Sequence, residues 1–387
     1  MVYLDYAATT PLNKRVKEAM IKAMDYYGNP SSNYTLANNS NQILEDCRKE
    51  LTEYLNGSDG DFIFTSGGSE ANTQAITKTF PDAILYNPTE HDSTILAIQS
   101  LEYSSRLNVK TLQIPINPDG TVNVSKYKDM LDNCSEINNI FVTVMMVNNE
   151  TGALNNIKEL AKIAHEHFAR FHCDMVQALP HCKIDLEDLD VDYASFSAHK
   201  IGGPKGVGAL WIRHGNVINS LIEGGKQEYS LRGGTQNVIG IAGFAEAIRV
   251  LKEQSVLDME ERNSGYREYL FSKLKEAGIE FIPNTPANRS SRTDGIVNIS
   301  IPKLHGDATV IALDEFFKVF VSTASACSAS GISYVLQKMG LSSDRVASAL
   351  RISFGAETTQ KDIDTFVNAI SKVHNIFDGT KTFEENY

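Results

Sequence analysis

Between residues 61 and 213, short runs rich in β-branched and aromatic residues alternate with longer stretches of helical periodicity. Strands are expected at 62–65, 83–86, 140–147, 171–175, 193–197 and 207–213, and helices at 70–80, 92–103 and 157–168. Such alternation is typical of βαβ units and predicts a mostly parallel sheet. Because the strand runs are apolar on both faces, helices should cover both sides of that sheet. The chain is therefore expected to have an α/β fold.

The pattern changes after about residue 250. Long helical stretches at 236–277 are followed by strand-like runs at 295–301, 319–322 and 349–354 and by an amphipathic helix at 359–376, which Thr359 is expected to cap. A chain of 387 residues is longer than one typical core requires. We expect a large domain at 15–250 and a smaller α+β domain formed by 1–14 and 251–387.

Charge and composition exclude several function classes. The formal net charge of −12 is spread along the chain without a dense block of Lys and Arg, which disfavours direct contact with nucleic acid or anionic lipid. No apolar run approaches the roughly 20 residues that span a bilayer, and no signal-peptide pattern opens the chain, so a cytoplasmic protein without membrane contact is expected. The five cysteines are an odd number without CxxC pairs, which argues against a disulfide framework and a metal site.

The segment 195–210 is the most informative one for chemistry. A strand ends in Ser197, His199 and Lys200 and enters a turn rich in Gly and Pro. A lysine at a strand end can condense with an aldehyde if its surroundings keep the amine nucleophilic. An isolated turn lysine is more often a plain surface residue, so the neighbouring residues decide the matter.

An aldehyde cofactor with a pyridine ring needs an acid near the ring nitrogen. Asp174 ends an expected strand and Gln177 follows it, so both could face the crevice at the carboxyl edge of the sheet. The alternative for Asp174 is a turn former or a helix cap.

A phosphate on the cofactor would require backbone N–H groups and hydroxyls at a helix N-terminus. The turn 65–72 offers Gly68 and Ser69 before a helix, and Ser197, His199 and the turn 232–235 offer further donors. Taken alone, the turn at 65–72 fits a plain strand-to-helix connection equally well.

Four further residues are candidates, each with a structural alternative. His91 starts a helix and could stack on the ring and exchange protons, or simply begin that helix. Asn149 follows the most apolar strand and could bind the phenolic oxygen, or cap the strand. Arg351 lies in an apolar strand and could grip a carboxylate, or form a buried ion pair. Cys327 lies in a run of small residues whose exposed thiol could be reactive, while the other cysteines suit packing.

Together these segments resemble the cysteine desulfurases of the NifS/IscS type, in the class V aminotransferase group of fold-type I pyridoxal-phosphate enzymes. The resemblance covers nearly the whole chain and is carried by the segments 3–11, 28–32, 65–70, 89–91, 148–150, 174–177 and 197–209. Three features depart from the family pattern, namely Ala324 in place of the usual Gly, Tyr34 in place of a His, and a short spacing from Cys327 to Tyr334.

The resemblance implies pyridoxal 5'-phosphate bound covalently to Lys200, with Asp174 against the ring nitrogen and His91 on the ring. It places Asn149 and Gln177 near the phenolic oxygen, and Gly68, Ser69, Ser197 and His199 at the phosphate. Thr235 would reach the phosphate of the partner subunit in a homodimer. Arg351, with Asn149, would bind the substrate.

The activity implied by the resemblance is conversion of L-cysteine to L-alanine, with the sulfur transferred to Cys327 as a persulfide. A protein acceptor would then take the sulfur toward iron–sulfur clusters, thio-cofactors or tRNA thiolation. The alternatives are a selenocysteine lyase or a cysteine or cystine lyase of the same fold, and a non-catalytic scaffold for sulfur trafficking.

Overall fold

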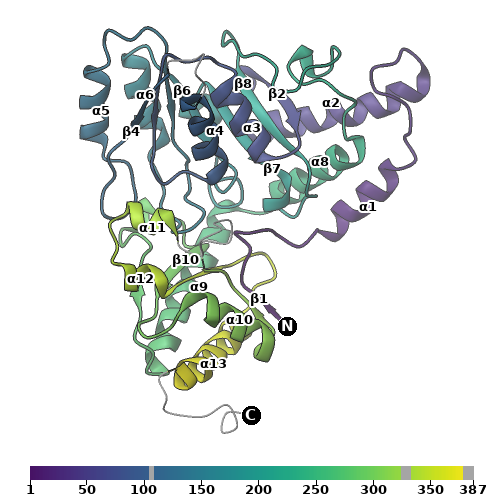
Figure 1. Cartoon of the computed structure of the whole chain (residues 1–387). Helices are drawn as coiled ribbons and strands as arrows, with labels where there is room; N and C mark the ends of the chain where they lie inside the picture. The colour runs from purple at the N-terminus through teal and green to yellow at the C-terminus, as the bar shows by residue number, and fades with distance from the viewer. Residues whose placement is uncertain (104–108, 324–332, 378–387) are drawn as a thin grey trace.

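A mixed seven-stranded sheet forms the centre of the larger part of the molecule (Figure 1). The computed structural model describes residues 1–103, 109–323 and 333–377. In spatial order the strands are β2 (Gly60–Thr65), β8 (Gly208–Arg213), β7 (Tyr193–Ser197), β6 (Arg170–Asp174), β5 (Ile140–Thr143), β3 (Ala83–Tyr86) and β4 (Lys110–Gln113). Among these strands β8 alone runs opposite to the other six. The predicted α/β fold with a mostly parallel sheet is confirmed.

The direction of β8 follows from the length of the connection before it. A parallel pair needs a crossover of about a dozen residues or more. Residues 198–207 are too few for that, and they contain only the short 3-10 helix η1 (Ala198–Lys200). The chain therefore turns back at the carboxyl edge of the sheet, and Lys200 remains at that edge.

Helices cover both faces of the sheet, as the apolar strands predict. One face packs on α3 (Gly68–Thr77) and α4 (Asp92–Glu102). The other packs on α2 (Thr35–Leu55), α5 (Val124–Asp132), α6 (Ile157–Glu166) and α8 (Val238–Lys252). The remaining helices of this part are α1 (Lys14–Ala23), which packs on α8, and the short α7 (Leu186–Leu189).

The smaller part of the molecule has its own core. An antiparallel sheet in the order β12 (Ala349–Ser353), β10 (Ile296–Ser300) and β9 (Ile282–Pro283) lies with the parallel pair β1 (Val2–Tyr3) and β11 (Val319–Phe320). The helices are α9 (Val256–Glu276), α10 (Gly306–Phe317), α11 (Tyr334–Lys338), α12 (Ser343–Ala347) and α13 (Gln360–Phe377). Val2 and Leu4 join the core built on these elements. We retain the division into 15–250 and 1–14 with 251–387 as a proposal, which this second core supports.

Several local features match the sequence patterns and several do not. The bounds of β3 and β7 are those expected, and the Thr359 hydroxyl accepts from the backbone N–H of Asp362 at 3.3 Å, as a cap does. Helices α1 and α2 were not anticipated. The strand expected at 140–147 ends at Thr143, beyond which the Met145 N–H donates to the Glu90 carboxylate at 2.5 Å rather than to a neighbouring strand.

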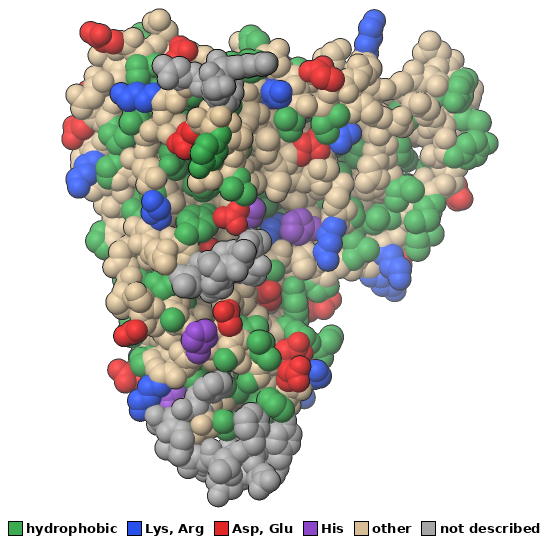
Figure 2. Space-filling view, in the orientation of Figure 1, with side chains coloured by type: hydrophobic (Ala, Val, Ile, Leu, Met, Phe, Trp, Pro, Cys, Tyr) green, Lys and Arg blue, Asp and Glu red, His purple; other side chains and the backbone are tan. Residues whose placement is uncertain are grey.

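The surface has the mixed charge that the composition predicts. On the face shown in Figure 2, Lys and Arg side chains are scattered among Asp and Glu and do not gather in one block. Among the described helices, none is long and apolar enough to cross a membrane.

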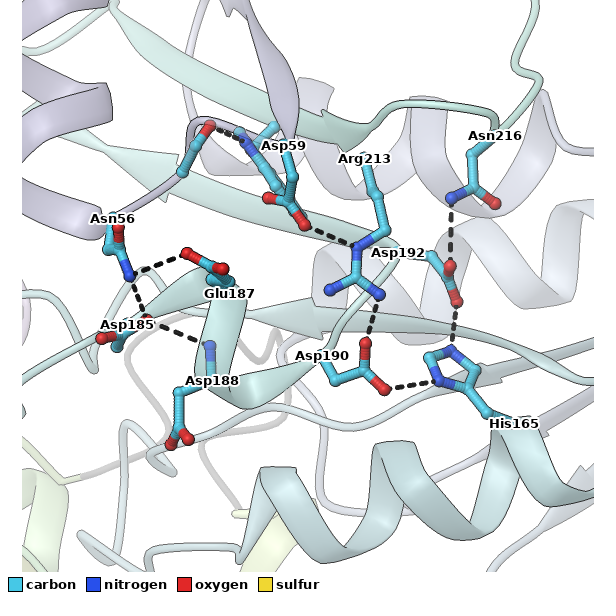
Figure 3. A network of polar contacts seen from close by, with 12 residues as sticks. Asn56, Asp59, His165, Asp185, Glu187, Asp188, Asp190, Asp192, Arg213 and Asn216 are labelled. Carbon is cyan, nitrogen blue, oxygen red and sulfur yellow. Dashed lines mark hydrogen bonds and ion pairs between the residues drawn. The ribbon is translucent and has the colours of Figure 1, made fainter.

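A polar network ties α6 to the ends of β7 and β8 (Figure 3). His165 contacts Asp190 at 3.0 Å and Asp192 at 2.9 Å, and Arg213 contacts Asp59 at 3.1 Å and Asp190 at 2.5 Å. The hydrogen bond with Asp192 raises the pKa of His165, although partial burial opposes the shift. The protonated ring is therefore the form that the fold prefers.

Replacing His165 by Gln should lower the free energy of unfolding in a pH-dependent way. Because the folded pKa lies above the unfolded value of about 6.5, the stabilisation is fully present below that pH and is lost as the pH rises through the folded pKa. We expect a loss of up to about 1 kcal/mol in mild acid and none in mild alkali, measured by urea unfolding. His214, whose pair with Asp61 is exposed, provides the control, His214→Gln. An equal loss at both pH values would contradict the assignment.

Candidate active site

The predicted site residues converge on one cavity of about 270 Å³ at the carboxyl edge of the sheet. Among the described site residues, all except Thr235 line the cavity, namely Gly68, Ser69, His91, Asn149, Asp174, Gln177, Ser197, His199, Lys200 and Arg351. Strand ends and helix starts of the larger part supply most of the wall. The smaller part closes it with Arg351 from β12 and with Ser333 and Tyr334 at the start of α11.

Lys200 is held by the N-terminal segment. Its Nζ donates to the backbone oxygens of Ala7 at 2.5 Å and Ala8 at 2.9 Å. Gln177 donates to the same Ala7 oxygen at 2.6 Å. Residues 7 and 8 thus connect the lysine turn to the segment after β6.

Asp174 is 4% exposed and is fixed at the end of β6. It accepts hydrogen bonds from Asn72 Nδ2 at 2.6 Å and from the backbone N–H of Val176 at 2.9 Å. Nearby, burial first and the Asp174 charge second raise the pKa of Glu90 well above its ordinary value. Burial and the nearby Asp174 carboxylate therefore favour the neutral form of Glu90.

His91 forms the N-cap of α4, as its position in the sequence suggests. Its Nδ1 accepts from the Ser93 backbone N–H at 3.1 Å and lies 2.8 Å from the Ser93 hydroxyl. Burial lowers the pKa of His91, and the charge of Lys200 lowers it further while Asp174 opposes both. The ring is thus neutral near pH 7, and because Nδ1 accepts a hydrogen bond, its proton lies on Nε2.

A second histidine of the cavity is also neutral. Burial, followed by the charge of Lys200, lowers the pKa of His199 to about 4. Its Nδ1 lies 3.1 Å from the Thr9 hydroxyl, so the N-terminal segment orients this ring too.

The turn before α3 lines one side of the cavity. Gly67 has φ +154°, a conformation that favours glycine, and a Cβ on Gly68 would lie 2.7 Å from Val176 Cγ2. The first N–H groups of α3 are therefore accessible beside Ser69 and Ser197, as a phosphate site requires. Arg232 fixes the opposite side of this turn through Glu70 at 2.9 Å.

Arg351 forms the buried ion pair that was one of its two predicted roles. It is 3% exposed and pairs with Asp5 at 2.7 Å, and its Nη1 donates to the Asn149 backbone oxygen at 2.9 Å. Its Nε is buried without a hydrogen-bond partner among the described residues. The ion pair is thus real, and the guanidinium keeps donor capacity toward the cavity.

Sequence reasoning missed two buried polar residues of the cavity. Asn72, one turn into α3, holds Asp174. Glu150 accepts from the Ser333 hydroxyl, which also caps α11 through the N–H of Leu336. Burial raises the pKa of Glu150 to about 7, although Ser333 and Arg351 oppose the shift. A polar residue directly after an apolar strand was the available signal for Glu150.

Thr235, the remaining predicted site residue that the structure describes, is exposed and does not line this cavity. Cys327 lies outside the described residues. The other cysteines are free thiols, and burial raises the pKa of Cys182 to about 12 and that of Cys173 well above its ordinary value. In the described part of the chain, no group of three or more His, Cys, Asp or Glu side chains could hold a metal ion.

Comparisons with known proteins identify the same family over nearly the whole chain. Residues 2–366 match the family described as aminotransferase class-V. The cysteine desulfurase IscS of Dictyoglomus turgidum is 35% identical over 384 residues, which covers 96% of this chain and 94% of the relative. A Clostridium botulinum protein of the same name is 35% identical over 381 residues, with the same coverage.

Solved structures give the same result. The NifS-like protein from Rickettsia africae superposes with a TM-score of 0.84 at 30% identity, covering 97% of this chain and 99% of that chain. The cysteine desulfurase of Thermococcus onnurineus has a TM-score of 0.81 at 22% identity, covering 97% and 94%. The latter likeness concerns the fold alone.

Replacing Glu150 by Gln should stabilise the protein in mild alkali. Because the folded pKa of about 7 exceeds the unfolded value of about 4.3, the contribution of Glu150 is fully present below the unfolded value and is lost as the pH rises through 7. The free energy of unfolding of the variant, measured by urea unfolding, should exceed that of the wild type by roughly 2 kcal/mol near pH 8 and by much less near pH 5. Exposed Glu159 provides the control, Glu159→Gln, and no gain near pH 8 would refute the burial argument.

Proposed function

Because the chain belongs to the aminotransferase class-V family, as a cysteine desulfurase of the IscS type, we propose that it transfers the sulfur of L-cysteine to Cys327 as a persulfide and releases L-alanine. The convergence of Lys200, Asp174 and His91 on one cavity carries this proposal. These residues come from three separate segments, and such a set is what an aldehyde cofactor with a pyridine ring requires.

The cavity fits pyridoxal 5'-phosphate, the cofactor that this family uses. Asn149 Oδ1 and Gln177 Oε1 are buried without a hydrogen-bond partner in the described part of the chain, and an unpaired buried polar atom is costly unless a ligand pairs with it. When bound, the cofactor supplies an aldehyde that bonds to amines and a ring that takes up electrons from the substrate.

Each residue of the cavity then has a role. Lys200 would hold the aldehyde, Asp174 would face the ring nitrogen, and His91 would lie against the ring. The amide N–H groups of Asn149 and Gln177 would donate to the phenolic oxygen. The phosphate would be held at the start of α3, among Gly68, Ser69, Ser197 and His199.

Lys200 and His91 carry out the proton transfers. The Lys200 amine is the base that takes the proton from the substrate Cα. The His91 proton lies on Nε2, because Nδ1 accepts from the Ser93 N–H. We therefore assign His91 Nε2–H as a proton donor to the carbon skeleton after the sulfur leaves.

The sulfur transfer itself is carried by the Cys327 thiolate, which attacks the substrate Sγ. An S–S bond forms and the Cβ–Sγ bond breaks. The electron pair of the broken bond stays on the carbon skeleton, which takes up a proton and leaves as alanine. The high thiol pKa of buried Cys173 and half-buried Cys182 removes these two as competing nucleophiles.

A homodimer and a protein acceptor of the sulfur complete the proposal. Exposed Thr235 would reach the phosphate in the partner's cavity, and the Arg232–Glu70 pair fixes its turn. The persulfide would pass to a protein that supplies iron–sulfur clusters, thio-cofactors or tRNA thiolation. A cytoplasmic location remains a prediction from the sequence.

Two substitutions separate cofactor binding from sulfur transfer. Cys327→Ser should keep the absorbance of lysine-bound cofactor but form neither persulfide nor alanine from L-cysteine, whereas Lys200→Ala should lose that absorbance. Mass spectrometry of the protein and quantification of alanine are the measurements. Cys134→Ser, which changes a buried thiol outside the cavity, is the control. Normal alanine output from Cys327→Ser would contradict the assignment of sulfur transfer to Cys327. Faster turnover of L-selenocysteine than of L-cysteine would favour the lyase alternative.

Arg351→Lys should weaken substrate binding more than it slows turnover. A lysine keeps the charge but loses the planar pair of donors that grips a carboxylate. We expect KM for L-cysteine to rise by about tenfold with a smaller fall in kcat, the pattern for a contact made equally in ground and transition states. Arg292→Lys, at a buried ion pair with Asp294 outside the cavity, controls for general loss of stability, and an unchanged KM in Arg351→Lys would refute the role.

A further inference from the structure

A second cavity of about 470 Å³ lies between the two parts of the molecule. The larger part contributes the start of α1, the end of α8 and the turn at 200–202, and the smaller part contributes α9 and the segment after β12. It shares only Lys200 with the lining of the candidate active site. Nothing in the proposed reaction uses its other residues.

Much of the wall of this cleft is apolar. The apolar side chains come from both parts and surround the cleft, namely Pro11, Leu12, Ile201, Val250, Leu251, Met259 and Phe354. Small-molecule sites are concave and mostly apolar, with a few placed polar groups.

The charged groups of the wall are unbalanced. Exposed Lys14 and Lys17 and half-buried Arg262 line the cleft, and none of them has a carboxylate within ion-pair distance in the described part of the chain. Glu357 is the one acidic residue of the lining. By contrast Arg249 and Arg267, on the same helices α8 and α9, are paired with Glu50 and Asp294.

Of these three cationic side chains, Arg262 is the most buried. Its Nη2 reaches the Gly355 backbone oxygen at only 3.4 Å, and its Nε is buried with no hydrogen-bond partner among the described residues. The terminal Nη groups of a guanidinium can donate to a planar anion.

Two further polar side chains of the lining are independently unsatisfied. His181 is 8% exposed and Asn263 is 4% exposed. In the described residues neither His181 Nδ1 nor Asn263 Oδ1 has a hydrogen-bond partner. Burial lowers the pKa of His181 to about 4, so its ring is neutral, with Nδ1 lying against Gly295.

We propose that this cleft binds a small organic carboxylate, whose anionic group is held by Arg262 with Lys14 and Lys17 and whose apolar body packs against Met259, Leu251 and Phe354. The ligand would contact both parts of the molecule and also Ile201 and Gly202, next to the lysine of the proposed reaction. Its presence would therefore favour the relative arrangement of the two parts seen here. This inference does not depend on the proposed function.

Calorimetric titration of the cofactor-loaded protein with benzoate tests the proposal, with benzamide as the uncharged analogue. Benzoate should bind once per chain, and benzamide more weakly. Arg262→Gln should weaken benzoate binding by about tenfold, which corresponds to about 1.4 kcal/mol, and Met259→Trp should block it by filling the cleft. Arg289→Gln changes an exposed arginine outside the cleft and should leave binding unchanged.

The same titration of Arg351→Gln distinguishes the two cavities. Benzoate binding that survives Arg351→Gln and fails in Arg262→Gln supports the cleft. The proposal would be overturned if benzoate did not bind the wild type or bound Arg262→Gln as tightly as the wild type. It would also be overturned if only Arg351→Gln lost benzoate binding. None of these outcomes bears on persulfide formation, which tests the proposed function separately.

Discussion

The site depends on the short connection between β7 and β8, which returns the chain at the carboxyl edge of the sheet and leaves Lys200 there. The lysine is then held by the backbone oxygens of Ala7 and Ala8. These belong to an N-terminal segment whose Val2 and Leu4 are buried in the smaller core. One turn is thus connected to both parts of the molecule, and the cavity between them has a fixed shape.

Electrostatics then determine what the cavity can do. Burial and the nearby Asp174 carboxylate favour the neutral form of Glu90, and Asp174 itself is held by Asn72. His91 and His199 are neutral because burial and the charge of Lys200 both disfavour imidazolium. Arg351 supplies a buried cation with Asp5 as its partner. A cation, an anion and neutral proton carriers therefore lie within one small space, as chemistry on an amino acid requires.

Much of this arrangement could be predicted from local pattern. The bounds of β3 and β7 and the cap at His91 follow from periodicity and helix-start chemistry, and parallel strand ends meet at one edge. The spatial order of the strands could not be predicted, because it is set by contacts distant in sequence. Asn72 and Glu150 were missed for the same reason: their roles arise from Asp174, Ser333 and burial between separate elements. The role of Thr235 across a subunit interface and the transfer of sulfur to Cys327 rest on family resemblance.

The central claim is that the cofactor is bonded to Lys200 and to no other lysine. Borohydride reduction of the cofactor-loaded protein makes such a bond permanent, and peptide mapping by mass spectrometry then locates it. The account predicts a reduced phosphopyridoxyl group on the peptide that contains Lys200. Its appearance on Lys205 instead, or on no lysine of this turn, would contradict the account.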